Sequence, residues 1–412
     1  MAKIDDSVKK KVPELRFPGF TDDWEERKLG EFSDVRDGTH ASPKYVSQGH
    51  PMVTSKNLTH SGLDMTDVSF LTDEDFNEIN KRSKVSIGDI LFGMIGTIGN
   101  PVIVDRDDFA IKNVALIKEK TSNPITNKWL LQYLKSPSFN RFIQKENAGG
   151  TQKFIALGLI RDMKLRVPEF DEQQKIGSFF KQLDDTIVLH QRKLDLLKEQ
   201  KKGFLQKMFP KNGAKVPELR FAGFADDWEE RKLSSGLREY TDRVIVEDDK
   251  EYYQISVRNN FGGITLRGSK MGNKIGRKRQ AKINLTKYPQ TLIFTRQTVE
   301  QGGIGWVDKY CDGAIVTENM PTISLDTSVF SKYFLTNLFQ TRIFYKNAIL
   351  DNVEGGSAQI AIHESKFLSS TLLFPNLDEQ EKIGQFFKQL DNTITLHQRK
   401  LDLLKEQKKG FL

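Results

Sequence analysis

Two short segments of the chain place a basic side chain directly beside an amide side chain. They are Lys56-Asn57 and Arg258-Asn259. Lys and Arg donate to the major-groove acceptors of guanine, and Asn pairs with the edge of adenine. The same residue types also cap turns, so the pairs alone leave both interpretations open. As a hypothesis about nucleic acids, they predict two separate places where base edges are read.

A strongly basic segment lies in the second half of the chain. Residues 267–282, RGSKMGNKIGRKRQAK, hold seven basic residues and no acidic one. Its glycines would let the backbone approach a phosphate strand closely. A solvated loop has a similar composition, but in a chain of net charge +8 we favour DNA contact. The predicted DNA-binding residues are Lys56, Asn57, Thr97, Lys153, Arg258, Asn259, Arg267, Lys270, Lys274, Arg277, Lys278 and Arg279.

No group of residues in the sequence predicts catalysis or metal binding. Residues 272–278, GNKIGRK, lack the spacing and the final hydroxyl residue of a phosphate-binding P-loop. The single cysteine, Cys311, excludes a disulfide framework and a Cys-rich zinc site. His40, His50 and His60 are widely spaced and have no cysteine beside them. We therefore predict no catalytic residue, no metal site and no cofactor held by this chain.

The elements that position these residues come from a duplicated framework. Residues 12–29 and 216–233 differ at two of eighteen positions. Residues 171–205 and 378–412 differ at four of thirty-five. The inserts between these segments are far less alike, as two readers of different targets would need.

The two inserts nevertheless share an order of elements. Residues 53–57 align with 255–259, and the glycines of 96–99 align with those of 303–305. A further match joins 149–152 to 355–358. Short β-rich runs and helical stretches follow in the same order in both copies. This order predicts an α/β (mixed α+β) domain in each copy. The runs are 90–92, 102–104, 115–117 and helical 127–147, then 291–295, 304–307, 321–325 and helical 330–347.

Long helices are predicted over 171–210 and 378–412. In both, a residue of the seam recurs at alternating spacings of four and three, the a/d pattern of a coiled coil. Antiparallel pairing with pseudo-twofold symmetry is expected, because the domain between the helices must return the chain. A seam also suits helices that only pack or dimerise. The seam residues are Ile176, Phe180, Leu183, Ile187, His190, Leu194, Leu197, Ile383, Phe387, Leu390, Ile394, His397, Leu401 and Leu404.

Polar residues in these helices have structural explanations. His190 and His397 are better explained as core polar residues that set the helix register than as metal ligands. Asp171 and Asp378 are predicted N-caps. Acidic residues near Lys, at Glu172 and Glu381, could suggest a nuclease, but carboxylates favour a helix N-terminus. A helix of about 33 residues would span ~50 Å, or ~15 base pairs of DNA.

The predicted domains are a first mixed domain (1–170), a long helix (171–210), a second mixed domain (211–377) and a second long helix (378–412). No apolar run approaches the ~20 residues that span a bilayer. The N-terminus also lacks the apolar stretch of a secretory signal. A cytoplasmic location is therefore expected.

Taken together, the repeated VPELRFxGFxDDWEERKL segments, the repeated helices and GDILFGMIGTIGNPVIVD at 88–105 resemble the specificity subunit of type I restriction-modification systems. The second insert departs from this pattern at TLIFTRQTVEQGGIGWVD. The resemblance implies that each recognition domain reads one half of a split sequence in double-stranded DNA. It implies that the two mixed domains are these target recognition domains and that the two long helices are a spacer, which fixes the gap between the two half-sites. It also implies that the repeated segments dock two methyltransferase subunits.

The same resemblance implies partners that carry the chemistry. Motor-endonuclease subunits would complete the restriction enzyme, and S-adenosylmethionine, ATP and Mg²⁺ would belong to partner subunits. Two alternatives stay open: an unrecognised DNA nuclease or methyltransferase, and a coiled-coil scaffold. The recognised bases are not readable from the sequence, because shape readout adds positions that no side chain touches.

Overall fold

The computed structural model describes residues 13–60, 62–120, 125–146, 154–211, 213–276, 279–352 and 361–412. The chain forms two compact units, each with its own core. Unit 1 comprises residues 1–191 and 399–412, and unit 2 comprises 192–398. Each unit therefore holds one recognition domain together with segments of both long helices.

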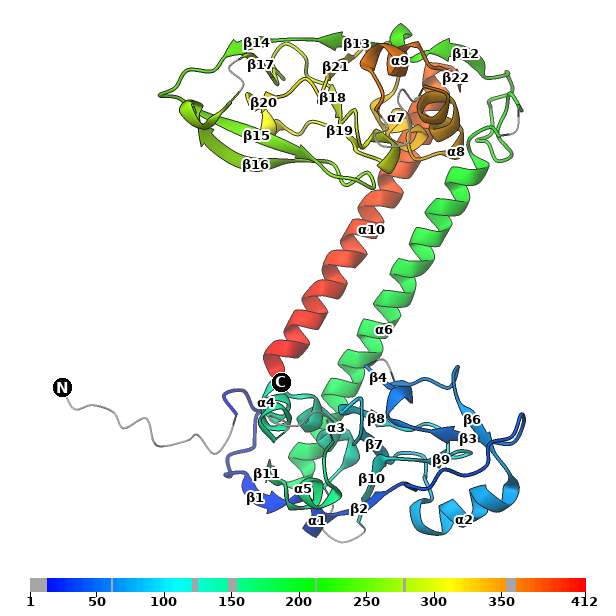
Figure 1. The fold of residues 1–412 in the computed structure, drawn as a ribbon, viewed down its shortest axis with the longest axis vertical. Coiled ribbons are helices and arrows are strands. Elements are labelled where there is room, and N and C mark those ends of the chain that lie inside the picture. The colour runs from blue at the N-terminus through cyan, green and yellow to red at the C-terminus, as the bar shows by residue number, and fades with distance from the viewer. Residues whose placement is uncertain are drawn as a thin grey trace, which may run out of the picture. The chain divides into compact units, whose positions relative to one another are not determined.

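A four-stranded antiparallel sheet forms the centre of unit 1 (Figure 1). In spatial order its strands are β2 (Ser33–Asp37), β10 (Val114–Glu119), β7 (Ile90–Gly93) and β8 (Gly99–Ile103). The smaller sheets are β1 (Glu25–Lys28) with β11 (Lys164–Val167), β6 (Ser69–Leu71) with β3 (His50–Val53) and β9 (Ala110–Ile111), and β4 (Leu58–Thr59) with β5 (Gly62–Leu63). The helices are α1 (Leu29–Phe32), α2 (Asp73–Ser83), α3 (Asn127–Lys135), α4 (Pro137–Glu146) and α5 (Leu157–Asp162).

Unit 2 repeats this plan with a larger second sheet. Its four-stranded sheet runs β13 (Leu237–Tyr240), β21 (Thr322–Leu325), β18 (Thr291–Phe294) and β19 (Ile304–Trp306), and its two-stranded sheet pairs β12 (Glu229–Lys232) with β22 (Thr371–Phe374). The five-stranded sheet runs β14 (Arg243–Ile245), β17 (Arg279–Lys282), β20 (Ile315–Val316), β15 (Glu251–Val257) and β16 (Ile264–Met271). The short helices are α7 (Lys332–Leu338), α8 (Arg342–Phe344) and α9 (Glu364–Ser369).

The predicted α/β class and the predicted order of elements are confirmed. Each apolar run contributes to a strand, and in β7 and β18 all four residues are buried. The helical stretch 127–147 becomes two helices, α3 and α4. The break falls at Ser136, which precedes Pro137, because the residue before a proline disfavours the helical conformation.

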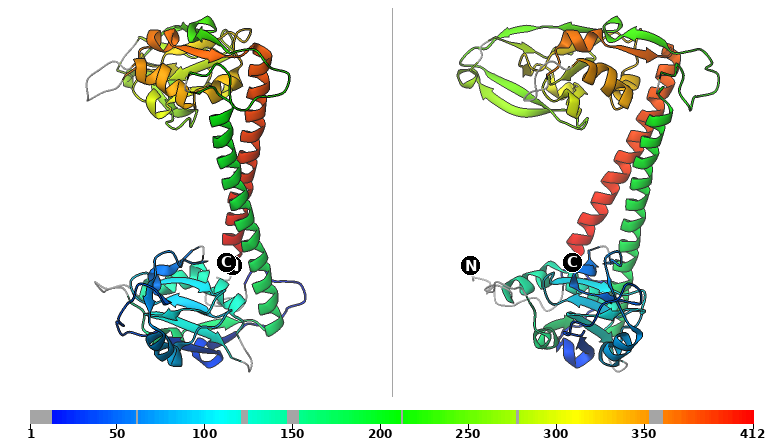
Figure 2. Two further views of the ribbon diagram at one scale, coloured as in Figure 1. Left: turned by 90° about the vertical axis from the view of Figure 1, so that its right-hand side faces the viewer. Right: turned by 45° about the vertical axis from the view of Figure 1, so that its right-hand side comes forward.

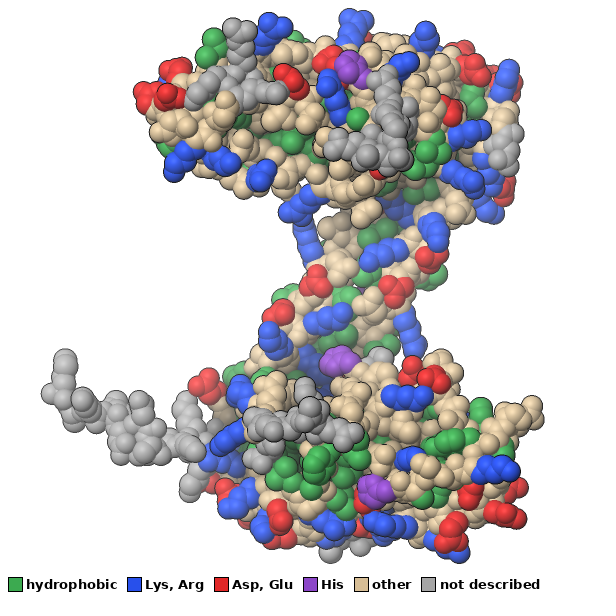
Figure 3. Space-filling model, viewed as in Figure 1, with side chains coloured by type: hydrophobic (Ala, Val, Ile, Leu, Met, Phe, Trp, Pro, Cys, Tyr) green, Lys and Arg blue, Asp and Glu red, His purple; other side chains and the backbone are tan. Residues whose placement is uncertain are grey.

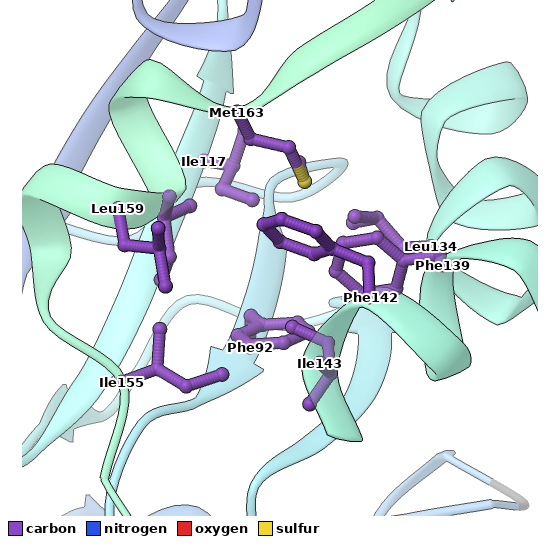
Figure 4. Close-up of a pocket in the computed structure, with 10 residues that line it drawn as sticks. Phe92, Ile117, Leu134, Phe139, Phe142, Ile143, Ile155, Leu159 and Met163 are labelled. Atoms are coloured by element: carbon purple, nitrogen blue, oxygen red, sulfur yellow. The ribbon is translucent and has the colours of Figure 1, made fainter. Parts of the chain in front are cut away.

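The core of unit 1 packs the sheet against α3, α4 and α5. Figure 4 shows apolar side chains from β7, β10 and these helices converging on one another. The cavity between them measures about 10 Å³, too little for more than one water molecule. Its lining is apolar throughout, so it is a packed core rather than a ligand site.

The long helices are α6 (Phe170–Lys207) and α10 (Leu377–Phe411), close to the predicted bounds. The predicted caps are wrong. Asn376 accepts the backbone N–H of Glu379, so the chain enters α10 two residues before Asp378. The first helix likewise begins at Phe170, which places Asp171 inside the first turn.

A glycine near the start of each long helix allows close packing on the recognition domain. A Cβ at Gly177 would lie 2.8 Å from Cβ of Lys128, next to Trp129 of α3. A Cβ at Gly384 would lie 2.8 Å from the backbone nitrogen of Phe334 in α7. Both distances are too short for a side chain, so each helix needs glycine there to reach its domain.

Candidate nucleic-acid interface

In both units, a turn with a basic residue lies against a glycine-containing loop. In unit 1 the side chain of Asn100 donates to the carbonyl of Leu58, which joins the loop after β7 to the turn that follows β3. In unit 2 the backbone N–H groups of Asn260 and Phe261 donate to the carbonyls of Gln301 and Gly302. In each unit, the structure thus brings the turn that ends at Asn57 or Asn259 close to the glycine-containing segment of the same copy.

The turn in unit 1 contains Lys56 and Asn57, and only one of them faces solvent. Asn57 is 2% exposed, and its side chain accepts from Thr54 while donating to the carbonyls of Asp64 and Asp67. The prediction that Asn57 contacts DNA is therefore wrong, because its hydrogen-bonding groups hold the turn together. Lys56 is exposed and lies 2.8 Å from the carboxylate of Asp67.

The matching pair in unit 2 is available on the surface. Arg258 and Asn259 are both exposed at the tip of the β15–β16 hairpin. The Asn259 amide donates to the side chain of Gln301 at 2.7 Å, which fixes its orientation. In unit 1, Thr97 of the glycine loop is also exposed. The two units therefore present different side chains from corresponding turns.

The basic segment of unit 2 lies largely on strands. The pairing register shifts between Gln254 and Ile255, so Arg267 is the extra residue of a β-bulge, beside Gly268 with φ +130°. Bulges redirect a side chain out of the regular pleat. Lys270 on β16 and Lys274 in the following turn are exposed. Figure 3 shows basic side chains along the edge that β16 forms.

Some predicted contacts fall outside the described residues. These are Lys153, Arg277 and Lys278, together with the glycine segments 149–152 and 355–358. Arg279 starts β17, but its side chain lies outside the described part as well. The remaining predicted positions on unit 2 form one exposed ribbon and its tip.

Exposed aromatic residues accompany the basic ones in unit 2, and the sequence analysis missed them. Tyr253 on β15 and Phe261 at the hairpin tip are 53% and 42% exposed, and Tyr310 is 56% exposed. The hydroxyl of Tyr310 donates to the carbonyl of Ile264 and so ties the side chain to β16. Aromatic faces stack on bases in nucleic-acid interfaces. The signal was the EYYQISVRNNF run, which places Tyr253 and Phe261 on either side of Arg258 in one hairpin.

The described residues give no support for metal binding, for a cysteine nucleophile or for a membrane-spanning helix. They contain no group of three or more His, Cys, Asp or Glu side chains that could hold a metal ion. Cys311 is buried, and burial raises the pKa of its thiol, which disfavours the nucleophilic thiolate. No helix within the described ranges is long and apolar enough to cross a membrane.

The framework holds each recognition domain through a buried ion pair. Glu172 of α6 is fully buried and accepts two hydrogen bonds from Arg16, at 2.9 and 2.7 Å. Glu379 of α10 is also fully buried and accepts two from Arg220, both at 2.7 Å. Buried charges require such partners, so Glu172 is a structural residue and offers no support for a nuclease.

The helix segments within each unit pair in antiparallel fashion, and they lie side by side in the views of Figures 1 and 2. In unit 1 the ring of Phe179 contacts that of Phe411, and Asp184 binds Lys408 at 2.6 Å. In unit 2 the equivalent contacts join Phe386 to Phe204 and Asp391 to Lys201. All fourteen predicted seam residues are buried or half-buried.

Exposed leucines recur on the outer side of these helices. Leu189 and Leu403 of unit 1 are 66% and 58% exposed, and Leu196 and Leu396 of unit 2 are 52% and 65% exposed. Each pair repeats the other at the framework offset of 207 positions.

An open cleft of about 690 Å³ also lies in unit 1 between residues 17–20 and the first turns of α6.

Comparison with known proteins identifies the family. Residues 21–199 and 226–406 each match the type I restriction modification DNA specificity domain. The chain therefore belongs to this family and is a specificity subunit of the type I restriction-modification class. The resemblance noted in the sequence is confirmed.

Relatives and solved structures agree over nearly the whole length. The MjaVIII type I restriction enzyme specificity subunit of Methanocaldococcus jannaschii is 22% identical over 424 residues, covering 98% of this chain and 93% of that protein. The S subunit structure from M. genitalium superposes with a TM-score of 0.60 at 12% identity, covering 97% of each chain. A structure from a study of complex assembly and conformational transition of the type I R-M system gives 0.53 at 15% identity, again covering 97% of each. The structural matches show the shared fold.

Proposed function

We propose that this chain is the non-catalytic, DNA-reading subunit of a type I restriction-modification complex, in which each recognition domain reads one half of a bipartite target. The observation that carries this proposal is the contrast between the two units. Several of their framework contacts recur at equivalent residues, as in the Arg16–Glu172 and Arg220–Glu379 pairs. Their exposed turns differ in chemistry, as in Lys56 against Arg258 and Asn259.

The equivalent frameworks support docking of two identical methyltransferase subunits. Two equal partners need two equal surfaces related by a pseudo-twofold axis. The leucine pairs Leu189/Leu403 and Leu196/Leu396 supply an exposed apolar surface of this kind in each unit. Exposed apolar side chains that gather on one surface are typical of a site that a protein partner covers. The partners would supply the chemistry, with S-adenosylmethionine for methylation and ATP and Mg²⁺ for the restriction complex.

The helices would set the gap between the two half-sites. A helix of 38 residues, such as α6, is about 57 Å long at ~1.5 Å per residue. That length corresponds to about 17 base pairs at ~3.4 Å per step.

A domain exchange tests the proposal. The chain is expressed with a type I methyltransferase subunit, and methylated adenines are located by sequencing the DNA of the cells. Replacing residues 30–168 with the matching part of another such subunit should change one half-site and leave the other half-site and the gap unchanged. If both half-sites changed, independent reading by the two domains would be wrong. Methyl transfer or cleavage by this chain alone would instead support the enzyme alternative.

A further inference from the structure

The imidazole ring of His40 lies between two oxygen atoms in unit 1. Its Nδ1 is 2.7 Å from Oδ1 of Asn113, and its Nε2 is 2.9 Å from Oδ2 of Asp37. A neutral imidazole carries one N–H and can donate to only one oxygen. Both contacts are satisfied together when the ring is doubly protonated and cationic.

The charges around His40 favour the cationic ring on balance. Asp37 ends β2, and its side chain is 10% exposed. Arg82, in the last turn of α2, also donates to Asp37, so this carboxylate lies between a guanidinium group and the imidazole of His40. The hydrogen bonds to Asp37 and then to Asn113 raise the pKa of His40, whereas its burial and the charge of Arg82 act in the opposite direction. Asn113 itself, in the turn between β9 and β10, is uncharged.

Asn113 connects His40 to the turn that carries Lys56. Its backbone has φ +56°, a left-handed conformation that asparagine tolerates better than most residues. Its carbonyl accepts the hydroxyl of Ser55 at 3.2 Å, and its N–H donates to the carbonyl of Thr39 at 3.2 Å. Ser55 opens the same 3-10 turn in which Lys56 is exposed. The Lys56 turn therefore has one contact to Asn113, through the backbone carbonyl of that residue, in addition to the hydrogen bonds of Asn57. The side chain of Asn113 contacts His40.

We infer that His40 is a positioning residue: as a cation it holds Asn113, and through it the Lys56 turn, in the arrangement that meets the first DNA half-site. This inference rests on the proposed function. The expected affinity for the first half-site is full while His40 is protonated and falls as the pH rises through its pKa. The second recognition domain, 211–377, contains one histidine, His363, which caps α9.

The first experiment measures the protonation of His40 without DNA. The full chain is labelled with ¹⁵N-histidine, and ring nitrogen signals of its six histidines are followed by NMR from pH 5 to 9. The His40→Gln variant assigns the signal. We expect the titration midpoint of the His40 ring nitrogens to lie above the ordinary ~6.5. A midpoint at or below that value would overturn the inference.

The second experiment measures how pH acts on each half-site. The chain in complex with its methyltransferase is titrated with a duplex carrying the full target and with two duplexes in which one or the other half-site is scrambled. Between pH 6 and 9, discrimination at the first half-site should fall roughly tenfold, the usual effect of one lost charged hydrogen bond, and discrimination at the second should stay constant.

Three variants separate positioning from a general loss of structure. His40→Gln and Asn113→Gly should bind the first half-site weakly at every pH with a flat profile, and glycine keeps the left-handed backbone at residue 113. Asn113→Asp should move the midpoint to higher pH, since a second carboxylate stabilises the cation. A wild-type profile in His40→Gln, or equal pH dependence at both half-sites, would overturn the inference alone. No specific binding at any pH would overturn the proposed function with it.

Discussion

At the scale of single residues, neighbours in the sequence have opposite roles in the turn of unit 1. Asn57→Ala removes hydrogen bonds to Thr54, Asp64 and Asp67 from a buried position, so it should lower the free energy of unfolding by about 1–3 kcal/mol. Lys56→Ala removes only an exposed ion pair and should change it by less than about 0.5 kcal/mol. Denaturant unfolding of both variants measures the difference.

The same two variants should reverse their order in DNA binding. Loss of Lys56 should weaken affinity for the first half-site and, if the contact is to a phosphate, reduce the salt slope by about one. A loss of binding in Asn57→Ala at temperatures where its fold is intact would contradict the structural role assigned to this residue.

Lys135 provides a pH prediction that is independent of DNA. It ends α3 and is partly buried beside Lys408 and Asp184; burial lowers its pKa, and the charge of Lys408 adds to this. Folding therefore disfavours the protonated form. The cost is complete below the lowered pKa and disappears as the pH rises toward the ordinary ~10.4, so unit 1 should gain stability with rising pH in this window.

In unit 2, Gln340 follows α7 and accepts from Lys201. Lys135→Gln copies this arrangement and should raise the melting temperature near pH 7, with the advantage shrinking toward pH 10. The matched variant Gln340→Lys should have the opposite effect. A pH-independent difference between wild type and Lys135→Gln would show that packing, rather than charge, is responsible.

At the scale of elements, the buried Leu401 and the exposed Leu403 of α10 allow the stability of the helix pair and its proposed docking role to be tested separately. Leu401 is 1% exposed and lies in the seam, so Leu401→Ala should cost about 2–5 kcal/mol of stability. Leu403 is exposed, and Leu403→Lys should leave the unfolding midpoint nearly unchanged. Under the proposed docking role, Leu403→Lys should nevertheless weaken binding of a methyltransferase subunit, measured by titration calorimetry. Unchanged binding in Leu403→Lys combined with Leu189→Lys would argue against docking on this surface.

The elements themselves were largely predictable from the sequence, and the roles of their polar residues were not. The repeats, the seam and buried strands such as 90–92 depend on apolar periodicity, which is local and strong. Asn57 was misassigned because its burial results from Asp64 and Asp67, which fold back over the turn. Arg267 was identified by its charge, but its place in a bulge depends on pairing with β15. Asp378 resembled an N-cap, but it is the side chain of the nearby Asn376 that accepts a backbone N–H of the first turn.

At the scale of the whole molecule, the proposal that the length of the two helices sets the gap between the half-sites can be tested, because equivalent residues can be removed from both helices. The contact Phe179–Phe411 in unit 1 is equivalent to the contact Phe204–Phe386 in unit 2. Removing one heptad from both helices, residues 188–194 and 395–401, keeps every remaining seam residue in phase. It should shorten the pair by ~10 Å and the preferred gap by about three base pairs, with both half-sites unchanged.

A three-residue deletion in both helices, 188–190 and 395–397, is the control. It turns each helix by ~300° rather than two full turns, so exposed positions would enter the seam. This variant should be destabilised, whereas the heptad variant should keep most of its unfolding midpoint. Sequencing of methylated DNA from cells that express each variant with the methyltransferase subunit measures the gap. Altered bases with an unaltered gap in the heptad variant would show that the helices do not set the spacing.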